Sequence, residues 1–444
     1  MTPVATTGRP VVGRSLPDDD VVQALQSWFG HQRWYPAKGT AARPQRVSVI
    51  ELRDPAGEAT VQVHLFRLPT GALLQVPTTL RGPDYRGLGC IASVAAGTLV
   101  DGPEDPAFAR AWLAAAQTDG AEPVVDLTGL RRLGGDQSNT SVVLPALRPP
   151  AILKVFRVLT AGPNPDVDVP LALARSGWAG VPRPIAWLAG EWPGETSAEV
   201  GHLGVLNELI SGARDGFELA CEHASRDRDF GDLAASLGRT LVRMHHALRL
   251  ALPVGPRTRQ SPTATVQEVT RLLRERARTA AGEIPALAVR LPGIERVLAD
   301  AADLESLPPL QRVHGDFHLG QVLLSGDGSW YVLDFEGEPQ ASATEKARPD
   351  LALRDLAGML RSLDYAAAIG GASSPKWAMT ARSRLVAGYR SQLSASAGEP
   401  VTDRLLQVLE LDKAVYEVVY ESRNRPDWVA IPLGGVDRLL GTTW

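Results

Sequence analysis

The sequence predicts an α+β protein built from three consecutive parts. Segments that alternate apolar and polar residues, such as VSVIEL and VQVHLFRL, are typical of strands and fill the first part. Short strands separated by loops follow, and beyond about residue 212 the apolar spacing becomes that of packed helices. A strand–turn–strand pattern at residues 313–338 interrupts the helical part. We therefore expect a β-rich first part, a small mixed β part and a large, mainly helical part.

The composition is that of an ordinary globular protein and excludes several classes of partner. Of the 444 residues, 44% are hydrophobic and 22% charged, and the formal net charge is -4. We therefore expect no nucleic acid and no membrane as partner. The two cysteines, Cys90 and Cys221, stand far apart, and no apolar run approaches a membrane span or signal peptide. These features predict a cytoplasmic protein, which we expect to be a monomer or a weak homodimer.

The first part is predicted to cover residues 1–122. An aromatic-rich segment at residues 21–37 is expected to form a hydrophobic anchor, because it contains two Trp, one Phe and one Tyr. Strands are expected within residues 46–78, and a helix from Pro106 to Gln117. The polar stretch TDGAEP then reads as a linker.

The second part is predicted to cover residues 123–211. After a Pro- and Gly-rich turn, a helix is expected to begin near residues 166–168 and to end near Ser176, with Pro170 in its first turn. The expected strands lie at residues 127–133, 141–144, 151–155, 184–188 and 202–206. The third part, residues 212–444, is predicted to be helical at residues 232–252, 264–280, 350–369, 377–392 and 402–424.

The strand–turn–strand segment carries polar residues at a spacing typical of phosphoryl transfer. The motif HGD ends at Asp316, Gln321 follows five residues later, and Asp334 begins the pair DF. Asp316 is expected to orient the attacking sugar hydroxyl and to accept its proton. Gln321 and Asp334 are expected to bind Mg²⁺, with Glu336 assisting through a water. A plain β-hairpin with surface acids is the alternative.

The two histidines of this segment receive different interpretations. His314 is expected to brace the loop backbone. His318 either reaches the substrate or has a structural role. No third ligand is spaced to make a metal site with them.

Lys154 is the strongest candidate outside the hairpin. It lies in the apolar strand AILKVF, and Lys occurs at only five positions in the chain. A buried Lys is costly unless it is paired, and kinases provide a nucleotide phosphate and a helix carboxylate as partners. We expect Asp168 to be that carboxylate, with Asp166 as second choice. A Lys on an edge strand that reaches solvent is the alternative.

Further nucleotide contacts are predicted from position. The loop from Gly134 to Ser141 has small polar residues, whose amides and side chains can approach phosphates. Its candidate ligands are Gln137, Ser138, Asn139 and Thr140. Glu208 and Leu209 lie where a hinge between two lobes would offer backbone groups to adenine.

The last long helix is predicted to present a polar and aromatic stripe. Residues three and four apart share one face of a helix. Aromatic rings beside carboxylates suit a carbohydrate, but a solvated face with internal ion pairs has the same pattern. The candidate substrate contacts are Lys413, Tyr416, Glu417, Tyr420 and Glu421.

Taken together, these motifs resemble the bacterial maltokinases, within the wider group of aminoglycoside-phosphotransferase-like and eukaryotic-type small-molecule kinases. The resemblance spans residues 20–440 and rests on HQRWYPAKG, QSNTS, LKVFR, HGDFHLGQVL, DFEGEP, LRDLAGMLRS and DKAVYEVVYESRNRPDW. It implies a bilobal, protein-kinase-like fold with an N-terminal cap subdomain, an intermediate nucleotide-binding subdomain and a helical C-terminal lobe. It also implies ATP and Mg²⁺ as cofactors.

Several positions depart from the maltokinase pattern. This chain has Phe317 in place of Leu, Asp168 in place of Glu, and PDLALRD in place of PDSPLRD. The segment from about 60 to 105 also differs. These departures are closer to the actinobacterial glucosamine kinases, so we expect phosphorylation of glucosamine at its 6-hydroxyl. Phosphorylation of maltose at its 1-hydroxyl and an antibiotic phosphotransferase remain alternatives. A nucleotide-binding module without catalysis would lack Asp316, Lys154 or Asp334, and all three are present.

Overall fold

The computed structural model divides the chain into two compact units. We call residues 1–174 and 182–210 the N-terminal unit, and residues 175–181 and 211–444 the helical unit. Side chains are not described for residues 262–265. The described residues are 10–13, 20–36, 43–134, 139–254, 262–302, 304, 307–337, 346, 348–393 and 403–441.

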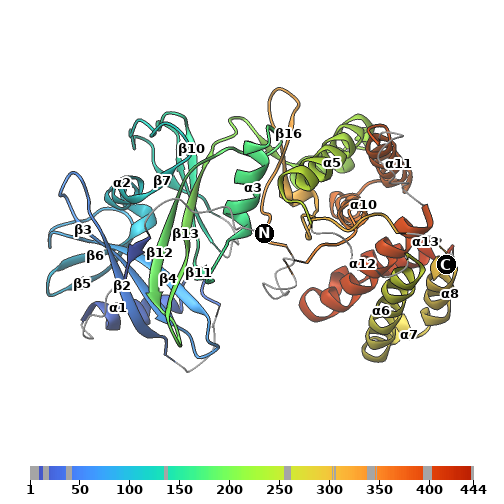
Figure 1. The fold of residues 1–444 in the computed structure, drawn as a ribbon, viewed down its shortest axis with the longest axis horizontal. Helices are drawn as coiled ribbons and strands as arrows, with labels where there is room; N and C mark the ends of the chain where they lie inside the picture. The colour runs from blue at the N-terminus through green and yellow to red at the C-terminus, as the bar shows by residue number, and fades with distance from the viewer. Residues whose placement is uncertain are drawn as a thin grey trace. The chain divides into compact units, whose positions relative to one another are not determined.

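The N-terminal unit is built on two β-sheets (Figure 1). One has the strand order β2-β3-β4-β6-β5, with β11 paired to β4. Its strands are β2 (Gln45–Leu52), β3 (Thr60–Arg67), β4 (Leu73–Arg81), β5 (Cys90–Val94), β6 (Gly97–Asp101) and β11 (Val158–Leu159). The predicted strands within residues 46–78 are therefore confirmed.

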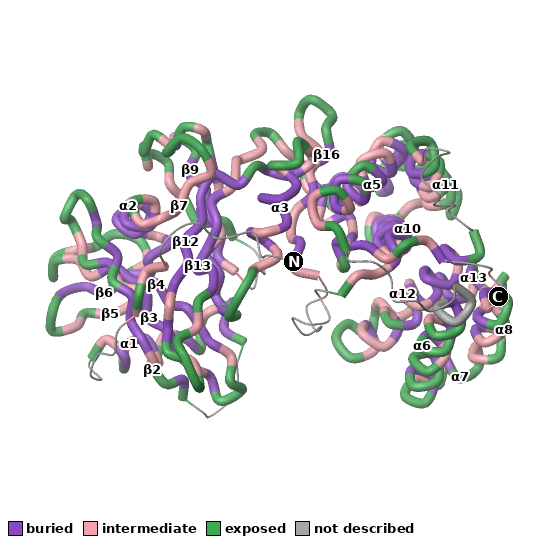
Figure 2. Tube along the Cα trace, viewed as in Figure 1, coloured by how far each residue is buried: buried purple, intermediate pink, exposed green. Residues whose placement is uncertain are grey.

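The other sheet has the order β1-β12-β13-β10-β9-β8, with β7 paired to β12. Its strands are β1 (Val11–Val12), β7 (Gln117–Thr118), β8 (Arg131–Arg132), β9 (Thr140–Leu144), β10 (Ala151–Val155), β12 (Pro184–Pro193) and β13 (Ala198–Glu208). The long strands β12 and β13 are buried along most of their length (Figure 2). The prediction of a strand over residues 127–133 was too long, because only Arg131–Arg132 pairs with β9.

The helices of this unit pack against the sheets. They are α1 (Asp20–Phe29), η1 (Gly102–Glu104), α2 (Pro106–Ala115) and α3 (Pro165–Arg175). The predicted aromatic anchor is confirmed, since Phe29, Trp34 and Tyr35 are buried with Phe66 in one apolar cluster. Pro170 lies inside α3 rather than in its first turn. Because proline has no amide hydrogen, the Asp166 carbonyl loses its usual helical partner there.

The helical unit contains the predicted helices and the predicted hairpin. The helices are α4 (Gly216–Ser225), α5 (Gly231–Ala251), α6 (Pro262–Glu283), α7 (Pro285–Ala288), α8 (Leu291–Ala302), η2 (Leu319–Gln321), α10 (Leu353–Gly370), α11 (Lys376–Arg390), α12 (Asp403–Asn424), η3 (Pro426–Trp428) and α13 (Ala430–Leu439). A small sheet, β14 (Arg214–Asp215), β15 (Val322–Leu324) and β16 (Trp330–Val332), interrupts them.

Helix α10 is buried along much of its length (Figure 2). It carries a buried carboxylate, Asp355, and a buried guanidinium, Arg361, as well as apolar residues. Charged groups are rarely fully buried unless they are paired. Both groups are paired, and their partners belong to the candidate site described below: Asp355 binds the backbone of the 313–337 loop, and Arg361 binds Glu417.

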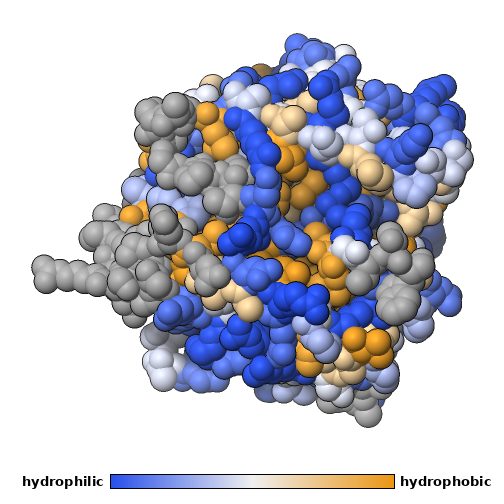
Figure 3. All heavy atoms as spheres, turned by 90° about the vertical axis from the view of Figure 1, so that its right-hand side faces the viewer, coloured by the Kyte–Doolittle hydropathy of each residue, from blue (hydrophilic) through white to orange (hydrophobic). Residues whose placement is uncertain are grey.

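The outer face of this unit is mostly polar. In Figure 3, which faces the side of the helical unit, apolar side chains show as patches among hydrophilic ones. Among the helices that the structure describes, none has both the length and the apolar character needed to cross a bilayer.

Candidate active site

The predicted hairpin positions the first group of candidate residues. β15 and β16 pair in antiparallel register, and the Gly328 amide donates to the Ser325 carbonyl at 3.1 Å to close the turn. Beyond the strands, the Leu333 amide donates to the Gln321 carbonyl at 2.9 Å. This pairing brings the two ends of the hairpin together, and the Gln321 Nε2 donates to Asp334 Oδ2 at 3.2 Å.

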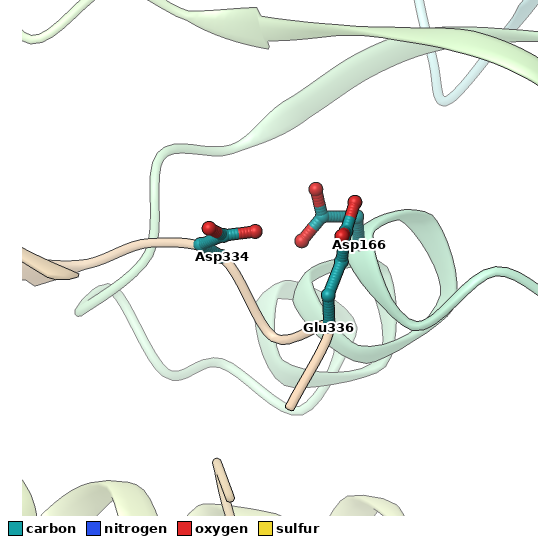
Figure 4. Close-up of side chains that lie close together, drawn as sticks. All are labelled: Asp166, Asp334 and Glu336. Carbon is teal, nitrogen blue, oxygen red and sulfur yellow. The ribbon is translucent and has the colours of Figure 1, made fainter. Parts of the chain in front are cut away.

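Asp334 and Glu336 form a group of oxygen donors. Both come from the short segment after β16, whereas Asp166 comes from the first turn of α3 in the other unit (Figure 4). A carboxylate oxygen of Glu336 lies within 4.8 Å of one of Asp334. Asp334 has a φ of 59°, a left-handed conformation that is uncommon for residues other than glycine. Such conformations persist where the surrounding structure enforces them, which is frequent at functional sites.

Asp316 lies on the loop that leads into the hairpin. Its side chain is 22% exposed, and the Lys413 Nζ from α12 lies 3.5 Å from its Oδ1. Burial lowers the pKa of His318, while the negative charges of Asp316 and Asp334 oppose this shift. Both carboxylates therefore act on the same ring. The His318 Nδ1 accepts from the Gly320 amide at 3.1 Å, which gives this histidine a structural role at the start of η2.

A buried carboxylate on α10 fixes the backbone of this loop. The His314 amide donates to Asp355 Oδ2 at 2.9 Å, and the Gly315 amide to Oδ1 at 3.0 Å. His245 Nε2 contacts the same carboxylate at 3.0 Å. Burial raises the pKa of Asp355, but the contacts with His245 and with the loop outweigh this effect and leave the pKa below its ordinary value. Sequence reasoning assigned no role to Asp355, although it lies in the quoted motif LRDLAGMLRS.

The role predicted for His314 is confirmed. Its Nε2 lies 2.8 Å from the Leu333 carbonyl oxygen, and its ring packs between Phe317 and Phe335 at centroid distances of 5.1 and 4.9 Å. Gly358 of α10 allows the loop to approach closely, because a Cβ at this position would lie 2.6 Å from the Phe317 carbonyl oxygen. The loop is thus held by its backbone and by buried rings.

The predicted stripe on α12 is present but its members differ in their contacts. Tyr416 and Tyr420 stack at a centroid distance of 6.3 Å, and the Lys413 Nζ lies 5.0 Å from the Tyr416 ring centroid. Glu421 is buried, and both its oxygens accept hydrogen bonds, from Arg425 and the Tyr365 hydroxyl.

In the described part of the chain, Glu417 accepts fewer hydrogen bonds than Glu421. Arg361 Nε donates to its Oε2 at 2.8 Å, and its Oε1 has no hydrogen-bond partner among the described residues. Burial raises the pKa of Glu417, and the positive charges of Arg361 and Lys413 oppose the rise. A carboxylate oriented through one oxygen and open at the other is suited to bind a further donor.

A network of charged side chains supports this part of α12. Arg361, which is fully buried, also donates to Asp364 at 2.5 Å. Arg382 and Arg438 bind Asp364 and the buried Glu410. Sequence reasoning missed the network, because its partners come from helices that are distant along the chain.

In the N-terminal unit, the partner of Lys154 differs from the first choice made from sequence. The Lys154 ammonium forms an ion pair with Asp166, and the prediction of Asp168 is wrong. Residues two apart on a helix point in different directions, so only one of the two carboxylates can face β10. Burial raises the pKa of Asp168 to about 6, although a backbone contact near Asn164 opposes the rise. Its Oδ2 is buried without a hydrogen-bond partner in the described part of the chain.

The other predicted nucleotide contacts remain predictions. Gln137 and Ser138 lie outside the described residues. Asn139 and Thr140 are described, and both bind Arg157. The Glu208 amide donates to the Arg183 carbonyl and the Leu209 amide to the Pro150 carbonyl, each at 2.9 Å. Because both amides already have partners, the predicted contacts with adenine would have to come from the carbonyl groups or side chains of Glu208 and Leu209.

Comparison with known proteins places these features in a family. Residues 28–119 match the family described as "Maltokinase N-terminal cap domain", and residues 218–372 match the family described as "Phosphotransferase enzyme family". A glucosamine kinase of Streptacidiphilus jiangxiensis is 32% identical over 343 residues, which cover 70% of this chain and 73% of that protein. The chain belongs to the glucosamine kinase family.

A second relative and a solved structure similar to this chain are also named glucosamine kinases. The protein from Mycolicibacterium smegmatis (strain ATCC 700084 / mc(2)155) is 29% identical over 335 residues, covering 70% of this chain and 80% of that protein. A solved glucosamine kinase in complex with glucosamine, ADP and inorganic phosphate is 25% identical with a TM-score of 0.67, and the match covers 94% of this chain and 99% of that one. The predicted family resemblance, the kinase-like α+β fold and the phosphotransferase activity are thereby confirmed.

Proposed function

We propose that this protein is an ATP-dependent glucosamine kinase, which transfers the γ-phosphoryl group to the 6-hydroxyl and forms glucosamine 6-phosphate. Two relatives named glucosamine kinases and a solved complex with glucosamine and ADP support this proposal. The observation that carries it is the contact between α12 and the catalytic loop: Lys413 reaches Asp316, and Glu417 lies one turn further along the helix.

In this proposal Asp316 is the catalytic base. A half-buried carboxylate on a loop whose backbone is fixed can orient the sugar hydroxyl and accept its proton. The open oxygen of Glu417 accepts a hydrogen bond from the glucosamine ammonium, and Tyr416 and Tyr420 offer ring faces to the sugar. Glu421 supports the site through Arg425 and Tyr365.

The donor set after β16 fits a hard divalent cation. Gln321, Asp334 and Glu336 provide only oxygen ligands, which Mg²⁺ prefers, once the Gln321 amide turns its oxygen inward. Bound there, Mg²⁺ would neutralise charge on the nucleotide phosphates. Lys154, held by Asp166, would pair with a phosphate in the same role that kinases give such a lysine.

Maltose is the second candidate acceptor. The match of residues 28–119 to the maltokinase cap domain favours it. A neutral disaccharide has no ammonium, so it would leave the open oxygen of Glu417 without a charged partner.

A coupled ADP-release assay over glucosamine, glucose, maltose and aminoglycosides tests the proposal. We expect the largest kcat/KM for glucosamine, with phosphate on oxygen 6 of the product. Turnover of maltose with phosphate on oxygen 1, and none of glucosamine, would contradict it. A cytoplasmic location, a monomer or weak homodimer, and the absence of a nucleic-acid partner stay predictions.

A further inference from the structure

A fully buried arginine joins the region matched by the cap domain to the loop predicted to bind phosphates. Arg157 follows β10 and has no exposed surface. On the cap side, its Nη2 donates to Asp101 Oδ1 at 3.4 Å, and its guanidinium carbon lies 4.2 Å from the Trp34 ring centroid. Both partners lie within residues 28–119.

On its other side Arg157 binds two candidate nucleotide ligands. Its Nε donates to Thr140 Oγ1 at 2.8 Å, and its backbone amide donates to Asn139 Oδ1 at 3.1 Å. Asn139 is the last residue before β9, and the buried Thr140 is the first residue of β9. The side chains at this end of the loop are therefore fixed by Arg157.

The backbone of Arg157 is fixed by the cap as well. Its carbonyl accepts from the Gln75 amide of β4 at 2.8 Å. The Gln75 side chain donates to the carbonyls of Phe156 and Leu203. Lys154 lies three residues before Arg157, and in the sheet Val155 stands opposite Thr140. Arg157 thus contacts both the cap and the end of the loop, and it follows the strand that carries the candidate phosphate-binding lysine.

Stability alone does not account for this arrangement. Arg157 and Asp101 are both buried, so both charges are poorly solvated, and this burial lowers the pKa of Arg157 and raises that of Asp101. Arg157 Nη1 is buried with no hydrogen-bond partner in the described residues. Apolar side chains of similar volume often stabilise a fold as well as a buried ion pair or better. The planar guanidinium group of Arg157, in contrast, donates hydrogen bonds in fixed directions, and an apolar side chain cannot do so.

We propose that Arg157 is a positioning residue for the nucleotide, through which the cap holds Asn139 and Thr140 and so sets the affinity for the triphosphate of ATP. The inference rests on the proposed ATP-dependent function. It gives the cap a role in nucleotide binding rather than in sugar binding alone.

The test measures the KM for ATP, the KM for glucosamine, and Tm in the full-length chain. Arg157→Met and Asp101→Asn are expected to raise the KM for ATP about tenfold and to leave that for glucosamine within about twofold. A tenfold change corresponds to about 1.4 kcal/mol. Arg157→Lys, which keeps the charge but loses the fork, is expected to fall between Arg157→Met and wild type.

The matched control is Arg110→Met. Arg110 binds Asp54 of the cap at 2.7 and 3.1 Å and makes no hydrogen bond to Asn139 or Thr140. It is expected to lower Tm with no change in the KM for ATP. If Arg157→Met does not fold, Asp101→Asn carries the test, because Asp101 binds Arg157 Nη2 and is not itself a candidate nucleotide ligand.

A lower Tm with an unchanged KM for ATP in Arg157→Met and Asp101→Asn would overturn the inference, because Arg157 would then support only the fold. An equal rise of both KM values would overturn it too, because the effect would not be specific to the nucleotide. Failure of the wild-type chain to bind ATP in calorimetry would instead overturn the proposed function on which the inference rests.

Discussion

The loop and hairpin that carry the proposed base, residues 313–337, and helix α12 are held in place by different kinds of bonds. Main-chain amides of His314 and Gly315 bind one buried carboxylate, Asp355, and the hairpin closes through backbone pairing. On α12, in contrast, Glu417 and Glu421 are held by the side chains of Arg361 and Arg425. The loop depends on its backbone, and the helix face on its particular charged residues.

This difference predicts that the reaction and the choice of acceptor depend on different parts of the helical unit. As long as Asp355 is kept, the backbone hydrogen bonds of the loop persist when other neighbouring side chains change, so the proposed base and metal ligands keep their geometry. A face held by side-chain ion pairs changes with each substitution, because removing one partner leaves the other charge buried and unpaired. We infer that the loop sets the reaction and that α12 and its supporting network set the acceptor.

The largest effect is expected from Asp316→Asn in the loop. An amide cannot accept the sugar proton, and general-base catalysis contributes about 10²–10⁴-fold. We expect kcat in the ADP-release assay to fall by about that factor, with ATP affinity in calorimetry little changed. Asp327→Asn, an exposed acid in the turn of the same hairpin, is the control and should keep its turnover. Retained turnover in Asp316→Asn would exclude the base role.

Asp334→Asn is expected to weaken magnesium-dependent nucleotide binding by at least about tenfold. The loss of a charged oxygen ligand lowers the affinity for a hard cation. Asn is chosen because it tolerates the left-handed backbone of Asp334, so that strain does not confuse the result. Calorimetric titration of ADP with and without Mg²⁺ measures the effect. If ADP affinity in this variant depends on Mg²⁺ as strongly as in wild type, Asp334 is not a metal ligand.

Asp355→Asn tests the backbone anchor of the loop. An amide side chain has one acceptor oxygen, so it cannot reproduce the carboxylate, which accepts from the His314 amide at Oδ2 and from the Gly315 amide at Oδ1. We expect kcat to fall about tenfold to a hundredfold, with a lower Tm. The control is Asp232→Asn on α5, which is 93% exposed. A lower Tm with an unchanged kcat would show that Asp355 supports the fold but not the catalytic geometry.

The same variant gives a pH dependence with a defined sign. The pKa of Asp355 is lower in the folded state than its ordinary value. Its contribution to the free energy of unfolding is therefore complete above that ordinary value, about 3.9, and is lost as the pH falls through the lower folded-state pKa. The difference in stability between wild type and Asp355→Asn, from denaturant titrations, should shrink on acidification. A difference that grows would contradict the depressed pKa.

The smallest effects are expected on α12, and they separate its two acids. Glu417→Gln should raise the KM for glucosamine about tenfold and that for glucose much less, because only glucosamine carries an ammonium. Glu421→Gln should affect both sugars more equally, since both its oxygens already bind Tyr365 and Arg425. The assay compares KM for the two sugars in each variant. Equal changes in Glu417→Gln would argue against ammonium recognition.

The sequence predicted the loop better than the helix face because the information is local in one case and distant in the other. Asp316, Gln321 and Asp334 lie within a segment short enough for its turn to bring Gln321 and Asp334 together, and their bond at 3.2 Å bears this out. Glu417 and its partner Arg361 are 56 residues apart, and no spacing rule joins them. The same limit applies to the carboxylate of Lys154, because Asp166 and Asp168 are both close in sequence and only the register of α3 selects one.

The sequence alone determined the α+β order and the hairpin, since each follows from residue types at short, regular spacing, and its motifs carried the resemblance to the family. Only the tertiary structure decided that Asp355 anchors the loop, that Arg361 orients Glu417, and that Arg157 connects the cap with Asn139 and Thr140. These groups are buried charges, and a buried charge is stable only beside partners that folding brings from elsewhere in the chain.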